Sequence, residues 1–408
     1  MAANTDDIGQ VVTAHASSRT AIIGPIAANV AFVMEITLVP LLLSAIQLKF
    51  SLTVGDLAWV FNAYGIGVAA GVFLGGWCGD VFNTRKVFGF GVAFFAAGSL
   101  VVAASESFEM LITGRLLQGL GAGVFSPLVP LLLTQVSPQK PGRMLIVWGS
   151  IAGYVTAFAP FFYGHFLSAY GWRIAFVVIA ASAIVALFIL IVTHPRTEIA
   201  PATHPILDYS KLFQTPKLWM TFVYVFCTYG SITYYLFKLP IWLSKSDDRS
   251  VSVGLALTIL WLTFSGLSTL LRNMVDRPHL RTIMLCAPVL IAAGVSLTYN
   301  NENLWLIVLS PVLIGAGLAC SNAPSTQLVL RFAPKGMSAV STSLDITFAR
   351  LGGIATVAIL AESAFAYAVL SICLLSLVAF FCAREACKGF GTEPKIRTDR
   401  ITVEGAKG

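Results

Sequence analysis

Five charged side chains lie inside long apolar stretches of this 408-residue chain: Glu35, Arg115, Lys238, Asp345 and Arg350. Ionisable groups are expensive to bury away from water, so each of these residues is a candidate functional residue. A buried carboxyl group can take up and release a proton, and a buried arginine or lysine can bind an anion. The pattern therefore indicates ion binding and proton transfer within an apolar environment.

Glu35 and Arg115 are predicted to lie at similar depth. Glu35 is about 14 residues into the first apolar stretch, or roughly 21 Å along a helix, and Arg115 enters the fourth stretch from the other side by about 9 Å. Across an apolar membrane core about 30 Å thick, the two side chains would then lie at a depth that permits a contact. Burial favours the neutral form of a carboxyl group and a nearby arginine favours the charged form, so such a pair suits proton coupling. A permanent structural ion pair is the alternative.

The second half of the chain supplies three further charges. Arg350 lies about 12 residues into its stretch, near mid-depth, and is the strongest candidate there for substrate contact. Lys238 lies near the end of its stretch, so substrate binding and a solvated amine both remain open. Asp345 is five positions from Arg350 and points in another direction, so the two are not an obvious local pair. Asp345 is the next candidate for proton coupling after Glu35. Three bases against two acids favour a substrate with a carboxylate or another anionic group.

Polar and aromatic residues in the same stretches are candidates for lining a substrate path. Those predicted to bind substrate are Asn62, Tyr154, Phe158, Tyr234 and Asn322, and further candidates are Asn29, Tyr64, Phe161, Tyr229 and Tyr235. Most aromatic residues in membrane helices pack against neighbours or lie at the interface, so we expect fewer than half of them to touch substrate.

The elements that must position these residues are membrane-spanning helices. The chain is 57% hydrophobic and 11% charged, which is too apolar for a soluble protein of this length. Twelve stretches approach the ~20 residues that cross a bilayer as a helix. They cover residues 21–47, 57–79, 87–105, 109–134, 143–169, 172–193, 218–243, 251–272, 281–299, 303–329, 338–361 and 364–383. The predicted fold is therefore an all-α membrane protein with twelve transmembrane helices.

An internal repeat divides these helices six and six. Asp80 and Arg85 recur 196 positions later as Asp276 and Arg281, and the same offset relates Gly119 to Gly315 and several other residues without a gap. A constant register over apolar sequence is typical of parallel transporter repeats. We therefore expect two six-helix bundles related by pseudo-two-fold symmetry, with the substrate path between them.

The domain organisation follows from this division. We expect an N-terminal tail (1–20), an N-terminal six-helix bundle (21–193), a proline-rich linker (194–217), a C-terminal six-helix bundle (218–383) and a C-terminal tail (384–408). Residues 1–20 are polar and do not read as a secretory signal, so the first apolar stretch is expected to remain as a helix.

The distribution of basic residues predicts the orientation. The chain has 26 lysines and arginines, a few of them within predicted helices. Of those at or beyond the helix ends, only Lys49, Arg173, Lys245 and Arg249 fall on the side of the membrane opposite the two tails. Cytoplasmic loops carry the excess of basic residues, so both tails and the linker are expected in the cytoplasm. The net charge of +7 is thus a sign of topology, and we expect no nucleic-acid partner. The seven cysteines are predicted in helices or on the cytoplasmic side, so neither disulfides nor a metal site are expected.

Three local motifs, taken together, are similar to those of a known family. They are Gly75, Gly76, Asp80, Arg85 and Lys86 after the second helix; Arg115, Gln118, Gly119, Gly121 and Gly123 in the fourth; and Gly171, Trp172, Arg173 and Phe176 before the sixth. The chain resembles the major facilitator superfamily, and within it the twelve-helix drug/proton antiporters. Two positions depart from the family pattern: only Ala159-Pro160 and Gly164 remain of the antiporter signature in helix 5, and Asn83 replaces a glycine.

The resemblance assigns the loop after the second helix to a cytoplasmic gate. The gating residues are then Gly75, Asp80, Arg85 and Lys86, with Asp276 and Arg281 in the second half. Gly71, Gly75 and Gly79 recur every four positions and would let another backbone approach closely. Asp80 would approach the positive N-terminal end of helix 11 or pair with Arg85. The alternative is an ordinary basic loop with a helix cap.

These inferences favour proton-coupled export of a small amphiphilic molecule by alternating access. Uptake of an organic anion by symport, and a sensor or partner protein that does not transport, are the alternatives. No phosphate-binding loop or spaced metal-ligand cluster occurs, so we expect neither an enzyme nor a cofactor. The partners expected are protons, the substrate and lipids of the cell (inner or plasma) membrane, around a monomer.

Overall fold

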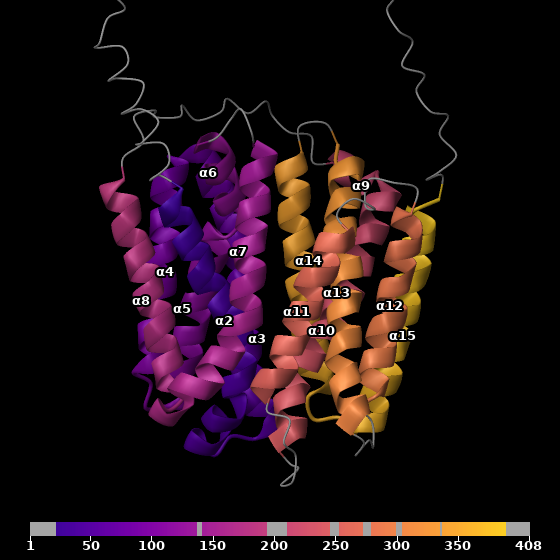
Figure 1. Cartoon of the computed structure of the whole chain (residues 1–408). Coiled ribbons are helices and arrows are strands. Elements are labelled where there is room, and N and C mark those ends of the chain that lie inside the picture. Colours follow the sequence, from indigo (N-terminus) through magenta and orange to yellow (C-terminus); the bar gives the residue numbers. More distant parts are fainter. Residues whose placement is uncertain are drawn as a thin grey trace, which may run out of the picture.

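The computed structural model describes residues 22–136, 141–193, 210–244, 253–271, 279–298, 304–334 and 337–388. Within these ranges the chain is helical and has no strand. The expected tail over 1–20, residues 194–209 of the expected linker and residues 389–408 lie outside the described residues. Twelve spans run up and down in two bundles of six (Figure 1), which confirms the predicted fold class.

The helices of the N-terminal bundle are α2 (Ile23–Phe50), α3 (Val54–Val81), α4 (Thr84–Ala103), α5 (Phe108–Phe125), α6 (Leu128–Val136), α7 (Pro141–Phe162) and α8 (Arg173–Val192). Those of the C-terminal bundle are α10 (Pro216–Ser244), α11 (Val253–Leu271), α12 (Leu280–Ser296), α13 (Leu304–Phe332), α14 (Ser338–Leu360) and α15 (Phe365–Ala386), preceded by the single turn α9 (Ser210–Phe213). Eight helices of the described part are each long and apolar enough to cross a membrane. We call the end of the molecule at which α6 and α9 lie the α6 end.

Two spans are less regular than the sequence predicts. The fourth breaks at Ser126 and Pro127 into α5 and α6, because proline lacks the backbone N–H of a helix interior and its ring clashes with the preceding turn. The fifth changes after α7 to a π-helix (Tyr163–Leu167) and then a 3-10 turn (Ser168–Tyr170). Pro160 lies one turn before this change and likewise removes a backbone donor.

The 196-residue repeat reappears as a repeat of helix contacts. In each bundle three glycines let two helices approach so closely that a Cβ atom would collide with the neighbour. In the N-terminal bundle, Gly98 contacts Gln118, Gly121 contacts Phe95 and Gly119 contacts Tyr64. The corresponding contacts of the C-terminal bundle are Gly294 with Ile314, Gly317 with Ile291 and Gly315 with Leu260. Every partner is displaced by the same offset as its glycine, so the two bundles are built on one packing scheme.

An arginine at each end joins α4 to α8. At the α6 end, Arg85 of α4 donates to the carbonyl oxygens of Leu190 and Thr193, which end α8. At the opposite end, Arg173 of α8 donates to the carbonyl oxygens of Ala103, the last residue of α4, and of Ser105, just after it, at 3.0 and 2.6 Å. The last carbonyls of a helix have no partner within it, so each arginine caps the other helix. The antiparallel pair is therefore fixed at both ends.

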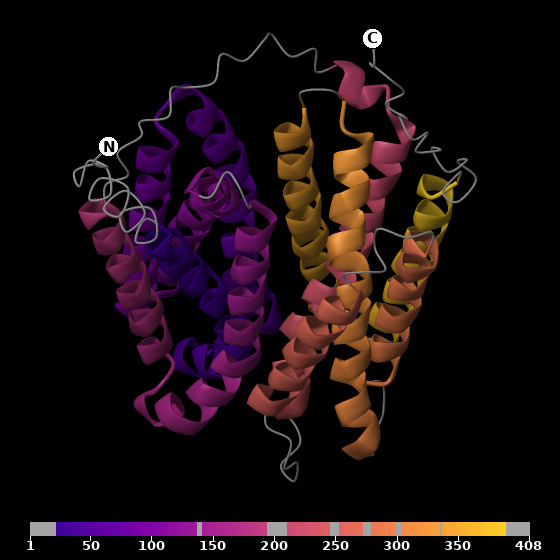
Figure 2. The same ribbon diagram turned by 45° about the horizontal axis from the view of Figure 1, so that its top comes forward.

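The two bundles meet along α3 and α14, α7 and α11, and α2 and α10. In the first half of α3, Phe61 packs on Phe237 of the other bundle with ring centroids 5.9 Å apart, and Asn62 donates to Ile354 O at 3.2 Å. In the second half of α3, the side chains of Phe73 and Leu74 are exposed. The ribbons of the two bundles accordingly separate toward the α6 end (Figure 2).

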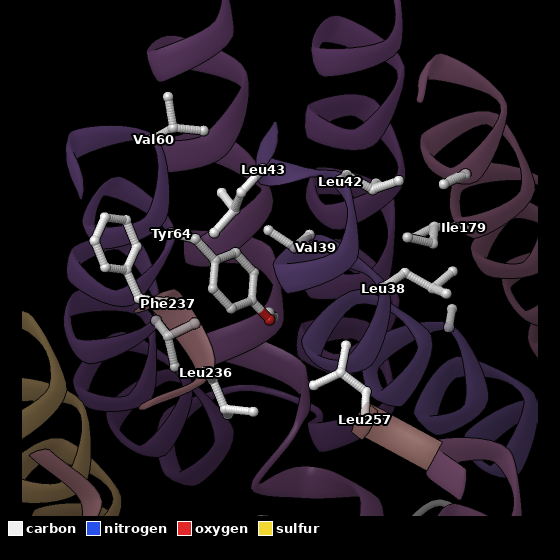
Figure 3. Close-up of a cluster of buried hydrophobic side chains, with 14 of the residues drawn as sticks. Leu38, Val39, Leu42, Leu43, Val60, Tyr64, Ile179, Leu236, Phe237 and Leu257 are labelled. Carbon is white, nitrogen blue, oxygen red and sulfur yellow. The ribbon is translucent and has the colours of Figure 1, made fainter. Parts of the chain in front are cut away.

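A buried apolar cluster continues from one bundle into the other. Figure 3 shows Tyr64 of α3 between Val39 and Leu43 of α2 and Leu236 of α10. The same cluster includes residues of α8 and α11, so the contact between the bundles is largely apolar at this level. The charged residues considered next lie beside this cluster.

Candidate functional site

A cavity of about 70 Å³ lies where the two bundles meet. Helices α2, α3 and α5 line it from one bundle, and α10 and α14 from the other. The lining residues are Glu35, Ile36, Val39, Phe61, Asn62, Tyr64, Gly65, Arg115, Thr233, Leu236, Arg350, Gly353 and Ile354. Three of the five charges singled out by the sequence, Glu35, Arg115 and Arg350, therefore border one space.

Glu35 and Arg115 form an ion pair inside the N-terminal bundle. Arg115 Nη1 donates to Glu35 Oε1 at 2.6 Å, and each residue is 1% exposed. Arg115 Nε donates to the carbonyl oxygen of Val60 at 3.1 Å. A buried charge needs both a counter-charge and hydrogen bonds, and this site provides them. The contact that the similar depth of the two residues permits is thus present.

Further side chains hold the Arg115 guanidinium in place. Nη1 also donates to Gln118 Oε1 at 2.6 Å, and Gln118 Nε2 donates to Ser99 Oγ of α4 at 2.9 Å. Arg115 lies over the ring of Tyr64, 4.6 Å from its centroid, which adds a cation–π contact. The Gln-Gly signature of the fourth helix thus has a physical role, because Gln118 positions Arg115.

Four polar groups at the cavity remain unsatisfied within the described residues. Glu35 Oε2, Asn62 Oδ1 and the Tyr64 hydroxyl are buried without a hydrogen bond, and Arg350 makes neither a hydrogen bond nor an ion pair. The Tyr64 hydroxyl lies close to Glu35 but outside the distance and angle limits of a hydrogen bond. Unsatisfied buried groups are rare in proteins. They provide a cation, two acceptors and a phenol for a ligand.

The charges at the cavity do not cancel. Glu35 and Arg115 neutralise each other, whereas no described residue neutralises Arg350. One positive charge therefore faces the space between the bundles. Such a site attracts an anionic group, and arginine is the side chain whose geometry best matches a carboxylate.

Apart from Arg350 and Asn62, the residues predicted to bind substrate lie outside the central cavity. Tyr154 and Phe158 are 65% and 52% exposed on α7. Lys238 donates to Ala361 O at 3.0 Å and borders, with Tyr234, a separate pocket of about 10 Å³. Asn322 Oδ1 accepts a hydrogen bond of 2.7 Å from the hydroxyl of Tyr229, within the C-terminal bundle. The structure does not bring these residues to the cavity, and their roles stay predictions.

Asp345 is also separate from the cavity. It lies on α14 and is 7% exposed. Its Oδ2 is 3.3 Å from the hydroxyl of Thr326 on α13, and its Oδ1 has no hydrogen-bond partner. Within the described residues it makes no ion pair. The two candidates for proton coupling thus occupy different bundles and different surroundings.

The predicted gating residues are only partly described. Gly75 packs against the backbone of Val124 on α5, and Gly71 makes the equivalent contact with Leu120, so α5 is the close neighbour expected for the glycine-rich face of α3. Arg85 caps α8, whereas Lys86 and Arg281 are exposed. The side chain of Asp80 and all of Asp276 lie outside the described residues. The gating role of these residues stays a prediction.

Several lining residues were not singled out by the sequence. Thr233, Gly353 and Ile354 carry no charge or motif that marks them. Tyr64, by contrast, was among the further candidates named from the sequence, and it does border the cavity. Ile36 and Val39 lie one and four residues after Glu35 on α2.

Comparison with known proteins gives one family match. The family described as Major Facilitator Superfamily matches residues 26–357. The tetracenomycin C resistance and export protein of Streptomyces glaucescens is 27% identical over 345 residues, which cover 79% of this chain and 60% of that protein. The multidrug resistance protein B homolog of Mycobacterium tuberculosis is 30% identical over 207 residues, which cover 50% of this chain and 38% of that protein. The chain thus spans less than two thirds of these relatives.

Solved structures resemble the fold over nearly its whole length. A D-xylose-proton symporter superposes with a TM-score of 0.72 at 15% identity, covering 91% of this chain and 96% of that one. An auto-inhibited peptide transporter of the POT family gives 0.72 at 14% identity, covering 93% and 98%. At this identity the likeness extends to the fold alone.

Proposed function

Because the chain belongs to the Major Facilitator Superfamily of transporters, we propose that it exports a small amphiphilic acid in exchange for protons by alternating access. The observation that carries the proposal is the placement of Glu35, paired with Arg115, and of Arg350 around one cavity between the bundles. A transporter built from two such repeats opens a central site to either side as the bundles rock.

The unsatisfied groups of the cavity suggest how substrate and proton compete. An acidic group of the substrate binds Arg350, and a hydroxyl or amine of the substrate donates to Glu35 Oε2. Protonation of Glu35 weakens this acceptor and its bond to Arg115, so a substrate that needs the donor contact is released. Proton entry from one side and substrate release to that side are thereby linked.

The direction of transport is inferred from the relatives. The names of two of them describe resistance and export, and we extend export to this chain. We place it in the cell (inner or plasma) membrane as a monomer, with both termini in the cytoplasm, because the basic residues concentrate on that side.

Uptake of an organic anion by proton symport is a second candidate, and the same cavity favours it. If Glu35 takes up a proton, Arg115 and Arg350 together leave two positive charges at the site. That charge strengthens binding of a substrate whose only polar group is an anion. The two candidates differ in whether proton and substrate move in opposite directions or together.

Flux in proteoliposomes separates the candidates. Vesicles with a trapped pH-sensitive dye are loaded with an amphiphilic acid, with methylenomycin A and tetracenomycin C among the probes because relatives are named for them. Export by antiport predicts that downhill efflux of the probe acidifies the vesicle interior. Alkalinisation would instead indicate symport, and flux without any pH change would contradict both candidates.

The role of Arg350 is tested with a matched control. We expect Arg350→Gln to weaken binding of an acidic probe by about 10- to 100-fold, the usual worth of a hydrogen bond to a charged group. Lys238→Gln also removes one positive charge from the C-terminal bundle, but outside the cavity, and should bind like the unmodified protein. Equal losses in both variants would show that overall charge, and not the cavity, determines binding.

A further inference from the structure

A buried carboxyl group in the C-terminal bundle is not used by the transport site described above. Asp345 lies on α14, one helix turn and a half from Arg350, and does not border the central cavity. Its side chain lies near Tyr229 of α10 and Thr326 of α13. A carboxyl group buried this far into a membrane protein requires a chemical explanation.

The hydrogen bonding of Asp345 is that of a neutral acid. A hydroxyl that donates to a carboxylate lies about 2.5–2.7 Å from it, because the charge shortens the bond. The hydroxyl of Thr326 is 3.3 Å from Oδ2, and Oδ1 has no partner. One long contact does not stabilise a buried negative charge, whereas a protonated carboxyl group tolerates it.

The charged and titratable groups around Asp345 do not change this balance. Tyr229 of α10 lies near both Asp345 and Arg350 but is an uncharged phenol, and its hydroxyl already donates to Asn322. Arg350 of α14 points toward the central cavity and makes no ion pair with Asp345. In the part of the chain that the structure describes, no other basic side chain pairs with this acid.

Glu35 provides the contrast within the same molecule. Its Oε1 is 2.6 Å from the Arg115 guanidinium, a short charge-assisted bond typical of an ionised carboxylate. The two buried acids therefore differ in geometry: one is paired with a cation and one is not.

We propose that Asp345 is a second proton-binding site, which carries its proton in this conformation and gives the C-terminal bundle its own carboxyl group for coupling. The protonation of Asp345 is independent of the proposed function. The use of that proton in transport rests on the proposed function. Tyr229 lies near both Asp345 and Arg350, so one side chain adjoins both this acid and the cation of the cavity.

Infrared difference spectroscopy of the purified protein near neutral pH tests the protonation. Subtracting the Asp345→Asn spectrum from that of the unmodified protein should reveal the C=O stretching band of a protonated carboxylic acid. The matched variant Glu35→Gln should instead remove carboxylate bands. A carboxylate signal from Asp345 would overturn the proposal, and so would a C=O band that disappears when sodium chloride is added, because the site would then bind sodium.

Thr326→Val provides a second test in case Asp345→Asn does not fold. This variant keeps the acid and removes its one hydrogen-bond partner, so the C=O band should move to higher frequency. An unchanged C=O region would show that Asp345 carries no proton there.

The use of this proton is measured separately, as the number of protons moved per substrate in proteoliposomes. Asp345→Asn should lower this number by one while transport continues. An unchanged number would overturn the coupling role of Asp345, although proton antiport through Glu35 would stand. If substrate moves no protons even in the unmodified protein, the proposed function is contradicted. Failure of the Asp345 proposal and failure of the proposed function therefore give different results.

Discussion

Glu35 of α2 and Arg350 of α14 border one cavity, although they belong to different six-helix bundles. Arg115 neutralises Glu35 from within the same bundle, and no described residue neutralises Arg350. Any movement of one bundle against the other changes the distance between these two charges. The candidate site is therefore assembled by both halves of the repeat.

Removing one partner of the buried ion pair should destabilise the protein more than removing both. Arg115→Gln leaves Glu35 buried without a counter-charge, at an expected cost of about 3–5 kcal/mol. The double variant with Glu35→Gln should unfold at a higher temperature than Arg115→Gln alone, because no lone charge remains. Thermal unfolding in detergent measures this difference. Effects that simply add would show that the two side chains do not interact.

Arg85 should contribute to stability through its cap on α8. Arg85→Ala removes two hydrogen bonds from a charged donor, each worth about 1.5–3 kcal/mol, and should lower the unfolding temperature. Lys86→Ala, an exposed basic neighbour, is the control and should unfold like the unmodified protein. A variant at Arg85 that keeps its stability and loses transport would favour the gating role over the cap.

The close approach of α3 and α5 predicts opposite effects at two glycines. In Gly71→Ala the new methyl group would meet the backbone of Leu120 and Gly123, and overpacking of this kind costs about 1–3 kcal/mol or more. Gly266→Ala on α11 meets nothing within 4 Å and should gain up to about 1 kcal/mol from the better helix propensity of alanine. Unfolding temperatures of the two variants should move in opposite directions. Similar values for both would contradict the packing described for α3.

The predicted orientation can be tested at exposed loop positions. An engineered cysteine at Tyr170, opposite the α6 end, should react with an impermeant thiol reagent added to intact cells. One at Asn83, at the α6 end, should react only after the cells are opened. The exposed native Cys286 is first replaced by serine to remove background labelling. The reverse pattern would invert the topology.

The sequence was sufficient for the architecture because membrane helices are encoded by simple physical rules. The length of each apolar stretch predicted twelve spans, and the repeat at Gly119 and Gly315 predicted that the two bundles pack alike, which the glycine contacts confirm. The break at Ser126 was missed, although Pro127 marks it, because an apolar stretch by itself does not show where the backbone is interrupted.

The site was predictable where charge was the signal. Burial of Glu35, Arg115 and Arg350 in apolar stretches pointed to the residues that now border one cavity. Depth along a helix does not reveal which way a side chain faces, so Lys238 and Tyr234 were expected there but lie at a separate pocket. Uncharged lining residues such as Thr233 and Ile354 become recognisable only once the bundles are assembled.

The central claim is that Glu35 is the proton-coupling residue. Measuring proton movement by the Glu35→Gln variant tests this claim most directly. Glutamine keeps the size of the side chain but cannot bind and release a proton at this position. The purified variant is reconstituted in vesicles with a trapped pH-sensitive dye, and an amphiphilic acid that the unmodified protein transports is added. We predict that the variant binds this probe more weakly, as a protonated Glu35 would, and that a saturating amount of probe moves one proton fewer per substrate than in the unmodified protein. A pH change equal to that of the unmodified protein would contradict the assignment of Glu35 as the proton-coupling residue.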